Sequence, residues 1–156
     1  MDKNHYLHWL EELLREGKKV NVRVNGMSMF PWIMPKDVIC AQSVEKHLLI
    51  PGCIVLFQSE TGWVAHRLIH IDNTNNQFIT RGDANLHKDS PLKYEAIKGI
   101  VIGVAQSKFF WTGWAVGRNA LFLAKTSWIT APLFWVTGKI SVWIWKRVKK
   151  IKGIKQ

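Results

Sequence analysis

Six short runs of β-branched and apolar residues fill the middle of the chain, and they constrain its fold more than any other feature. Turn-forming residues such as Pro35, the Pro51–Gly52 pair and the Gly82–Asp83 pair separate these runs at short intervals. Period-two runs of this length are typical of strands, and frequent turn signals between them are typical of a compact β domain. The runs lie at residues 20–24, 38–41, 54–57, 64–71, 78–80 and 100–104. We therefore predict a mainly β domain over residues 20–107.

Residues 1–19 predict a short amphipathic helix. Apolar side chains recur there at spacings of three and four, and Gly17 follows as a C-cap. These side chains are Tyr6, Leu7, Leu10, Leu13 and Leu14. No apolar h-region precedes the helix, so we expect no secretory signal peptide.

Residues 108–156 have a different composition from the rest of the chain. They contain 10 of the 22 Lys and Arg residues, none of the 11 Asp and Glu residues, and six of the nine Trp residues. Nearly all of the net charge of +11 therefore lies in this segment. We predict two helical segments, at about residues 109–124 and 128–145. The second is apolar on every side and would cover about 27 Å, slightly less than a hydrocarbon core of about 30 Å.

Trp interleaved with Lys and Arg is typical of a helix at a membrane interface. We therefore predict that residues 108–156 associate with an anionic membrane surface, with the C-terminus in the cytoplasm because basic residues follow the apolar segment. Three points stay open: whether these helices span the membrane or lie on it, on which side the β domain lies, and whether they instead pack on the β domain as a helical subdomain. Nucleic acid is not expected as a partner, because the interleaved aromatic residues favour lipid phosphate.

The two cysteines, Cys40 and Cys53, lie in apolar runs. They have neither CxxC spacing nor a histidine at metal-ligand distance, so we expect buried, reduced thiols. No metal or cofactor site is predicted.

Three polar segments contain residue types that catalyse acyl transfer. Ser28 directly follows a predicted strand, His66 lies in an alternating strand, and Asp83 and Asp89 lie in a polar loop. Each signal alone is weak, because a serine in a turn, a histidine in a strand and a Gly-Asp pair are common structural features. A serine hydroxyl needs a nearby base to become a nucleophile, and a histidine can act as that base near neutral pH.

Taken in this order, these segments resemble the superfamily of type I signal peptidases and self-cleaving SOS repressors. Gly26–Pro31 (GMSMFP) resembles the G-x-S-M-x-P nucleophile box, and Pro35–Val38 (PKDV) resembles the G-D-hydrophobic strand that follows it. Pro51–Val55 (PGCIV) resembles P-G-D-I-V. Most bacterial members have a lysine base where this chain has Val64–Arg67 (VAHR), so the resemblance is closest to the archaeal and endoplasmic-reticulum branch, which has V-H-R. That branch also has a G-D-x-N-x-x-x-D loop, and Gly82–Asp89 (GDANLHKD) matches each fixed position.

The resemblance covers about residues 20–105 and implies a role for each residue of the site. Ser28 would be the nucleophile, His66 the general base and then the general acid, and a carboxylate of the loop would orient the imidazole. Asp89 is our first choice for that carboxylate, and we expect Asp83 to shape the loop. His87, which lies between the two acids, stays open as a rival base. The Ser28 N–H is the expected donor to the oxyanion.

Three positions depart from the pattern of the superfamily. The usual signal-peptidase box reads S-G-S-M, so the serine hydroxyl that would contribute to the oxyanion hole is missing at Gly26. Cys53 replaces the aspartate of P-G-D, and Lys36 replaces the glycine of the first G-D. We expect Cys53 and Lys36 to be structural positions.

The resemblance implies a signal-peptidase-like serine endopeptidase of mainly β fold, with a short N-terminal helix and C-terminal membrane-associated helices. It would cleave a precursor or leader peptide at or near a membrane, with the peptide extended along a strand edge near Ser28 and small side chains before the scissile bond. Two alternatives stay open. One is a catalytically idle, peptidase-like binding module at the membrane. The other is a self-cleaving repressor, for which the region before Val20 is short for a helix-turn-helix domain.

Overall fold

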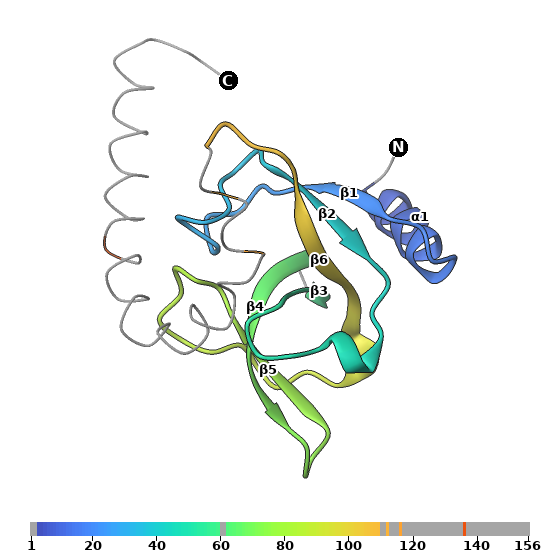
Figure 1. Cartoon of the computed structure of the whole chain (residues 1–156), viewed down its shortest axis with the longest axis vertical. Coiled ribbons are helices and arrows are strands. Elements are labelled where there is room, and N and C mark those ends of the chain that lie inside the picture. The colour runs from blue at the N-terminus through green and yellow to red at the C-terminus, as the bar shows by residue number, and fades with distance from the viewer. Residues whose placement is uncertain (1–2, 60–61, 110–111, 113–115, 117–135, 137–156) are drawn as a thin grey trace.

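The computed structural model describes residues 3–59, 62–109, 112, 116 and 136. These residues form one helix, six strands and two 3-10 turns (Figure 1). The elements are α1 (Lys3–Arg15), β1 (Val20–Arg23), β2 (Val38–Gln42), η1 (Lys46–Leu48), β3 (Ile54–Ser59), β4 (Gly62–Asp72), β5 (Gln77–Arg81), η2 (Tyr94–Ala96) and β6 (Ile97–Gln106). Each strand overlaps one of the six predicted runs. The prediction of a mainly β fold with one short N-terminal helix is therefore confirmed.

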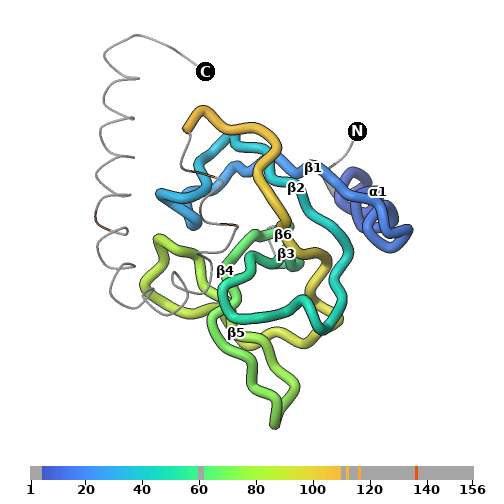
Figure 2. The backbone as a smooth tube through the Cα atoms, viewed as in Figure 1, coloured from blue at the N-terminus to red at the C-terminus, as the bar shows by residue number. Residues whose placement is uncertain are grey.

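The six strands form a single antiparallel sheet in the order β1-β2-β6-β3-β4-β5. Strand β6 is the last in the sequence, yet it lies in the middle of the sheet and pairs with both β2 and β3. The tube in Figure 2 shows this return of the chain through the centre of the domain. Strands β3, β4 and β5 follow one another as neighbours, and the β4–β5 hairpin projects away from the rest of the domain.

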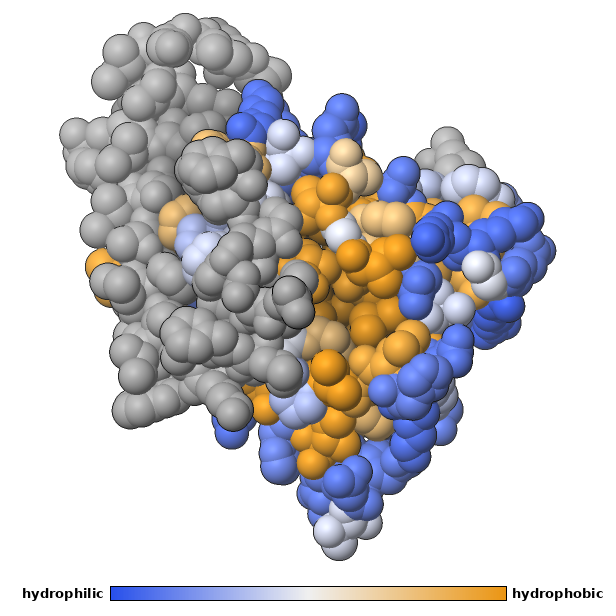
Figure 3. Space-filling model, viewed as in Figure 1, coloured by the Kyte–Doolittle hydropathy of each residue, from blue (hydrophilic) through white to orange (hydrophobic). Residues whose placement is uncertain are grey.

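Apolar side chains form two core clusters, one on each face of the sheet. Ile54 belongs to one cluster and its neighbour Val55 to the other, as expected for alternate residues of a strand. The first cluster contains Leu10 and Leu14 of α1, so the helix covers that face. In Figure 3, apolar residues gather in the middle of the visible face, while α1 and the β4–β5 hairpin present hydrophilic residues.

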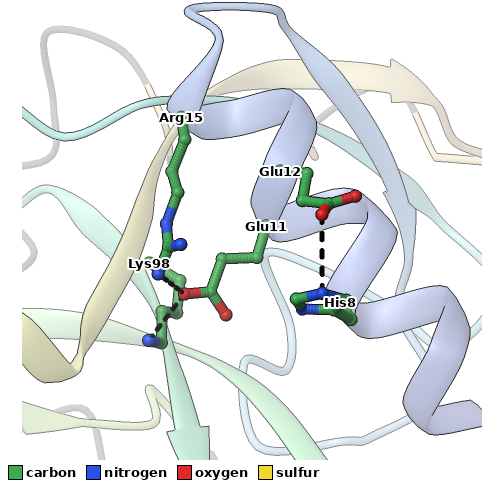
Figure 4. A network of polar contacts seen from close by, with 5 residues as sticks. All are labelled: His8, Glu11, Glu12, Arg15 and Lys98. Carbon is green, nitrogen blue, oxygen red and sulfur yellow. Dashed lines mark hydrogen bonds and ion pairs between the residues drawn. The ribbon is translucent and has the colours of Figure 1, made fainter.

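Helix α1 ends at a glycine cap and is tied to the sheet by an ion pair. Gly17 has a φ of +76°, and the Gly17 and Lys18 N–H groups donate to the Leu14 and Leu13 carbonyls, which is the Schellman arrangement. Glu11 accepts hydrogen bonds from Arg15 at 2.8 Å and from Lys98 of β6 at 3.0 Å (Figure 4). Partial burial raises the pKa of the Glu11 carboxyl, but these two cations outweigh it and lower the pKa below its usual value.

The expectation for the two cysteines was wrong in one respect. Cys40 and Cys53 are free thiols, but both are partly exposed rather than buried. Cys40 pairs across the sheet with Asn21 and Gly103, and these small or polar partners leave part of its face uncovered. Burial still raises the pKa of the Cys53 thiol to about 11, so this thiol is protonated at neutral pH.

The predicted helical segments at residues 109–124 and 128–145 lie outside the described residues except at four positions. Phe109 is exposed, Thr112 is buried, Val116 packs against the core cluster that α1 covers, and Val136 is helical and exposed. Among the described residues, no helix has the length and apolar character needed to cross a membrane.

The turn before β2 holds a lysine in a left-handed conformation. Lys36 has a φ of +80°, and its N–H donates to the Val24 carbonyl at 2.7 Å. The resembled G-D motif has glycine at this position. This conformation is about 1–2 kcal/mol less favourable for a residue with a Cβ atom, whereas glycine adopts it without this strain.

Replacing Lys36 by glycine should therefore stabilise the domain. We expect Lys36→Gly to raise the free energy of unfolding by roughly 0.5–1 kcal/mol, because the strain removed exceeds the entropy that glycine adds to the unfolded chain. Urea denaturation measures the change, and Lys36→Ala is the control because it keeps the Cβ atom. Equal stabilities of the glycine and alanine variants would show that the backbone at Lys36 is unstrained.

Candidate active site

His66 of β4 and Asp89 of the loop after β5 are joined by a short hydrogen bond. The His66 Nδ1 and Asp89 Oδ2 atoms are 2.7 Å apart. The same carboxylate oxygen accepts a hydrogen bond from Thr80 Oγ1 at 2.7 Å, and the Asp89 N–H donates to the Thr80 carbonyl at 2.9 Å. Thr80 lies opposite Leu68, two residues after His66, so Thr80 and His66 are on the same face of the sheet. Asp89 is thus held between them.

The protonation of this pair follows from its surroundings. Burial raises the pKa of the Asp89 carboxyl, but the hydrogen bond and charge of His66, together with the hydrogen bond from Thr80, lower the pKa below its usual value. Asp89 is therefore ionised at neutral pH and can only accept, which places a proton on His66 Nδ1 and leaves Nε2 as the basic nitrogen. The stability that ionised Asp89 provides is present above the unfolded-state pKa of about 3.9 and is lost as the pH falls through the folded-state pKa.

The His66 ring is nearly enclosed by the protein. Only 6% of His66 is exposed, and its ring packs against Phe57 of β3 in a T-shaped arrangement with ring centroids 5.8 Å apart. Nε2 makes no hydrogen bond to any described residue. The ring is therefore held by Asp89 on one side and by Phe57 on another, and Nε2 remains available to a proton donor.

Ser28 packs against Gly82 through a close approach of two loops. Gly82 directly follows Arg81, the last residue of β5, and Arg81 pairs with Arg67, the neighbour of His66 in β4. A Cβ atom on Gly82 would come within 2.7 Å of the Ser28 carbonyl oxygen and 2.9 Å of Ser28 Cβ. Ser28 thus occupies the space that a side chain at position 82 would fill. The Ala84 N–H donates to the Ser28 carbonyl at 2.8 Å and fixes this approach.

Within the described parts of the chain, no hydrogen bond joins Ser28 Oγ to His66, and none uses the Ser28 N–H. Nucleophile and base are often loosely aligned when no substrate is bound, and they tighten in the complex. Both Ser28 groups are therefore available: the hydroxyl to a substrate carbonyl and the N–H to a developing oxyanion.

Asp83 has a different partner from Asp89 and lies on the other face. Both of its carboxylate oxygens accept from Arg67, at 2.8 Å from Nε and 2.7 Å from the terminal nitrogen. Arg67 also donates to the Gly52 carbonyl at 2.8 Å. The two side chains are 1% and 6% exposed, so this is a buried, bidentate ion pair. Asp83 is fully engaged as the anchor of the loop and does not contact His66.

The remaining predicted residues lie outside this arrangement. His87 is exposed in the loop, and no hydrogen bond connects it with Ser28 in the described structure. Cys53 lies before β3 as a protonated thiol. No group of three or more His, Cys, Asp or Glu residues that could hold a metal ion occurs among residues 3–59 and 62–109 or the three isolated positions.

Comparisons of the chain with protein-family models, with curated proteins and with solved structures found no match.

Sequence reasoning missed three residues that shape the site. Thr80 is a second donor to Asp89, Phe57 packs on His66, and Arg67 is the partner of Asp83. Arg67 stands in the V-H-R motif, so its charge was a usable signal. Thr80 and Phe57 had no local signal, because their roles depend on which strands are neighbours.

The ion pair leads to a stability prediction. Asp83→Asn should lower the free energy of unfolding by about 3–5 kcal/mol, because it leaves the buried Arg67 guanidinium without its counter-charge. Thermal unfolding measures the loss. The matched control is Asp89→Asn, the same change six residues later at a side chain that is 23% exposed, and its loss should be clearly smaller. Equal losses for both variants would contradict the anchoring role of Asp83.

The close approach at Gly82 leads to a second prediction. Gly82→Ala should destabilise the domain by about 1–3 kcal/mol and displace Ser28, because the added methyl overlaps the Ser28 backbone. Gly103→Ala in β6 is the control, since a Cβ atom there meets nothing within 4 Å. Urea denaturation and the rate of Ser28 labelling by a fluorophosphonate measure the two effects. A Gly82→Ala variant with the wild-type stability and labelling rate would show that Ser28 is not packed against this position.

Proposed function

We propose that this protein is a serine endopeptidase of the signal-peptidase-like type, with Ser28 as nucleophile, His66 as general base and Asp89 as the acid that orients His66. The observation that carries the proposal is the 2.7 Å contact of His66 Nδ1 with Asp89, whose loop begins at Gly82, the residue against which Ser28 packs. A Ser-His-Asp relay would run from Asp89 through His66 to Ser28. The motif resemblance supports a peptide as the substrate.

The chemistry follows from the protonation of the pair. His66 Nε2 takes the proton of Ser28 Oγ as that oxygen bonds to the substrate carbonyl carbon, and the carbonyl electron pair moves onto oxygen. Asp89 stabilises the imidazolium that forms, and the Ser28 N–H binds the oxyanion. His66 then gives the proton to the leaving amine as the C–N bond breaks. Water attacks the acyl-enzyme by the same route and releases the second product.

The division of roles between the acids follows from their contacts. Asp89 touches His66, whereas Asp83 is saturated by Arg67. His87 is exposed and is not needed as a base. The catalytic set is therefore Ser28, His66 and Asp89, with Asp83 as the residue that positions the loop.

We further propose that residues 108–156 keep the enzyme at an anionic membrane surface. The support is the sequence: ten cations, no anions and six Trp residues in this segment. A membrane location would bring the site to the precursor or leader peptides that the motif resemblance implies as substrates.

The proposed function predicts non-additive losses of activity. Ser28→Ala and His66→Ala should each reduce peptide cleavage by at least about 10³-fold, and the double variant should be no worse than either, because residues that act as a unit are non-additive. The assay incubates full-length protein with a library of extended peptides and detects new termini by mass spectrometry. His87→Ala, at an exposed position in the same loop, is the control and should cleave normally. Near-normal cleavage by His66→Ala would refute the assignment of the base.

A further inference from the structure

The proposed oxyanion site has only one donor from the nucleophile turn. The Ser28 N–H is available, but Gly26 contributes no side chain. Oxyanion sites generally use two donors, and the second is often a side-chain amide or hydroxyl. A second donor near Ser28 should therefore come from another segment of the chain.

The Asn85 side-chain amide lies close to Ser28. Its Nδ2 atom is 2.8 Å from the point where a Cβ atom of Gly82 would lie, and Ser28 Cβ is 2.9 Å from that same point. The Asn85 amide and the Ser28 side chain therefore both lie against Gly82 and are close to each other. The backbone holds this placement, because the Asn85 N–H donates to the Gly82 carbonyl at 2.9 Å and the Ala84 N–H donates to the Ser28 carbonyl at 2.8 Å.

The Asn85 side chain does not hold the described structure together through hydrogen bonds. It makes no hydrogen bond to any of them, and it is partly exposed. Every fully buried polar side-chain atom in the described structure has a hydrogen-bond partner. Because the Asn85 amide has no such partner, it is not fully buried and is accessible. An accessible N–H donor beside a candidate nucleophile is suited to binding a negatively charged oxygen.

We propose that Asn85 is a catalytic residue that supplies the second, side-chain donor of the oxyanion hole; this rests on the proposed serine peptidase function. As the Ser28 Oγ–carbon bond forms and the Ser28 proton moves to His66 Nε2, the carbonyl π pair moves onto oxygen. The Ser28 N–H and Asn85 Nδ2–H donate to that oxygen. When the C–N bond breaks, the electron pair returns to the carbonyl and both hydrogen bonds weaken.

The test measures the rate of covalent labelling of Ser28 in the full-length protein by a fluorophosphonate. In this reaction the Ser28 Oγ–phosphorus bond forms, the phosphorus–fluorine bond breaks with release of fluoride, and negative charge develops on the phosphoryl oxygen. Asn85→Ala should slow labelling by about 10²- to 10³-fold with an unchanged melting temperature. Asn85→Asp keeps the shape but carries no N–H, so it should be at least as slow. Leu86→Ala, at the exposed neighbour, should label at the wild-type rate.

The pH profile separates an oxyanion donor from a residue that shapes the loop. Asn85 and Asp89 share one loop, so a structural defect would loosen the contact between Asp89 and His66 and move the midpoint of the labelling-rate profile. Loss of an oxyanion donor lowers the plateau and leaves the midpoint in place. Labelling of Asn85→Ala at the wild-type rate, or a shifted midpoint, would overturn the role of Asn85 while leaving the peptidase proposal intact. Failure of the wild-type protein to label at Ser28 would instead reject the proposed function itself.

Discussion

The buried ion pair between Arg67 and Asp83 is the interaction on which the rest of the candidate site depends. It fixes the start of the loop after β5 to the middle of β4, with both carboxylate oxygens engaged. The same guanidinium holds the Gly52 carbonyl, so the turn before β3 is tied to this loop as well. A buried guanidinium needs its counter-charge, so the start of the loop cannot move away from the sheet at low cost. Asn85 and Asp89 follow within the same loop and take their positions from it.

Strand alternation explains why two nearby acids have different roles. His66 and Arg67 are neighbours in β4, so their side chains point to opposite faces of the sheet. The loop supplies one acid to each face: Asp83 meets Arg67, and Asp89 meets His66. The Arg67 guanidinium binds both oxygens of its carboxylate, whereas the ring nitrogens of an imidazole suit it to proton transfer. One face is therefore structural, and the other is suited to proton transfer.

The sequence predicted the strands because alternating β-branched runs and turn residues are local signals. The helix end at Gly17 and the six runs all appear in the structure. The contact of Thr80 with Asp89 and the packing of Phe57 on His66 depend on which strands become neighbours, and this information is not local. The partial exposure of Cys40 was missed for the same reason, since it depends on the small or polar residues opposite. The motif order pointed to Ser28, His66, Asp83 and Asp89, but only coordinates could separate the two acids by partner.

The central claim is that His66 activates Ser28 as a nucleophile. The most direct measurement is mass spectrometry of the intact and digested full-length protein after reaction with a fluorophosphonate, which needs no knowledge of the natural substrate. We expect one phosphonyl group per chain, located on Ser28, and none on a folded His66→Ala variant. An unlabelled but folded wild-type protein, or a His66→Ala variant that labels at Ser28 as fast as wild type, would contradict the claim.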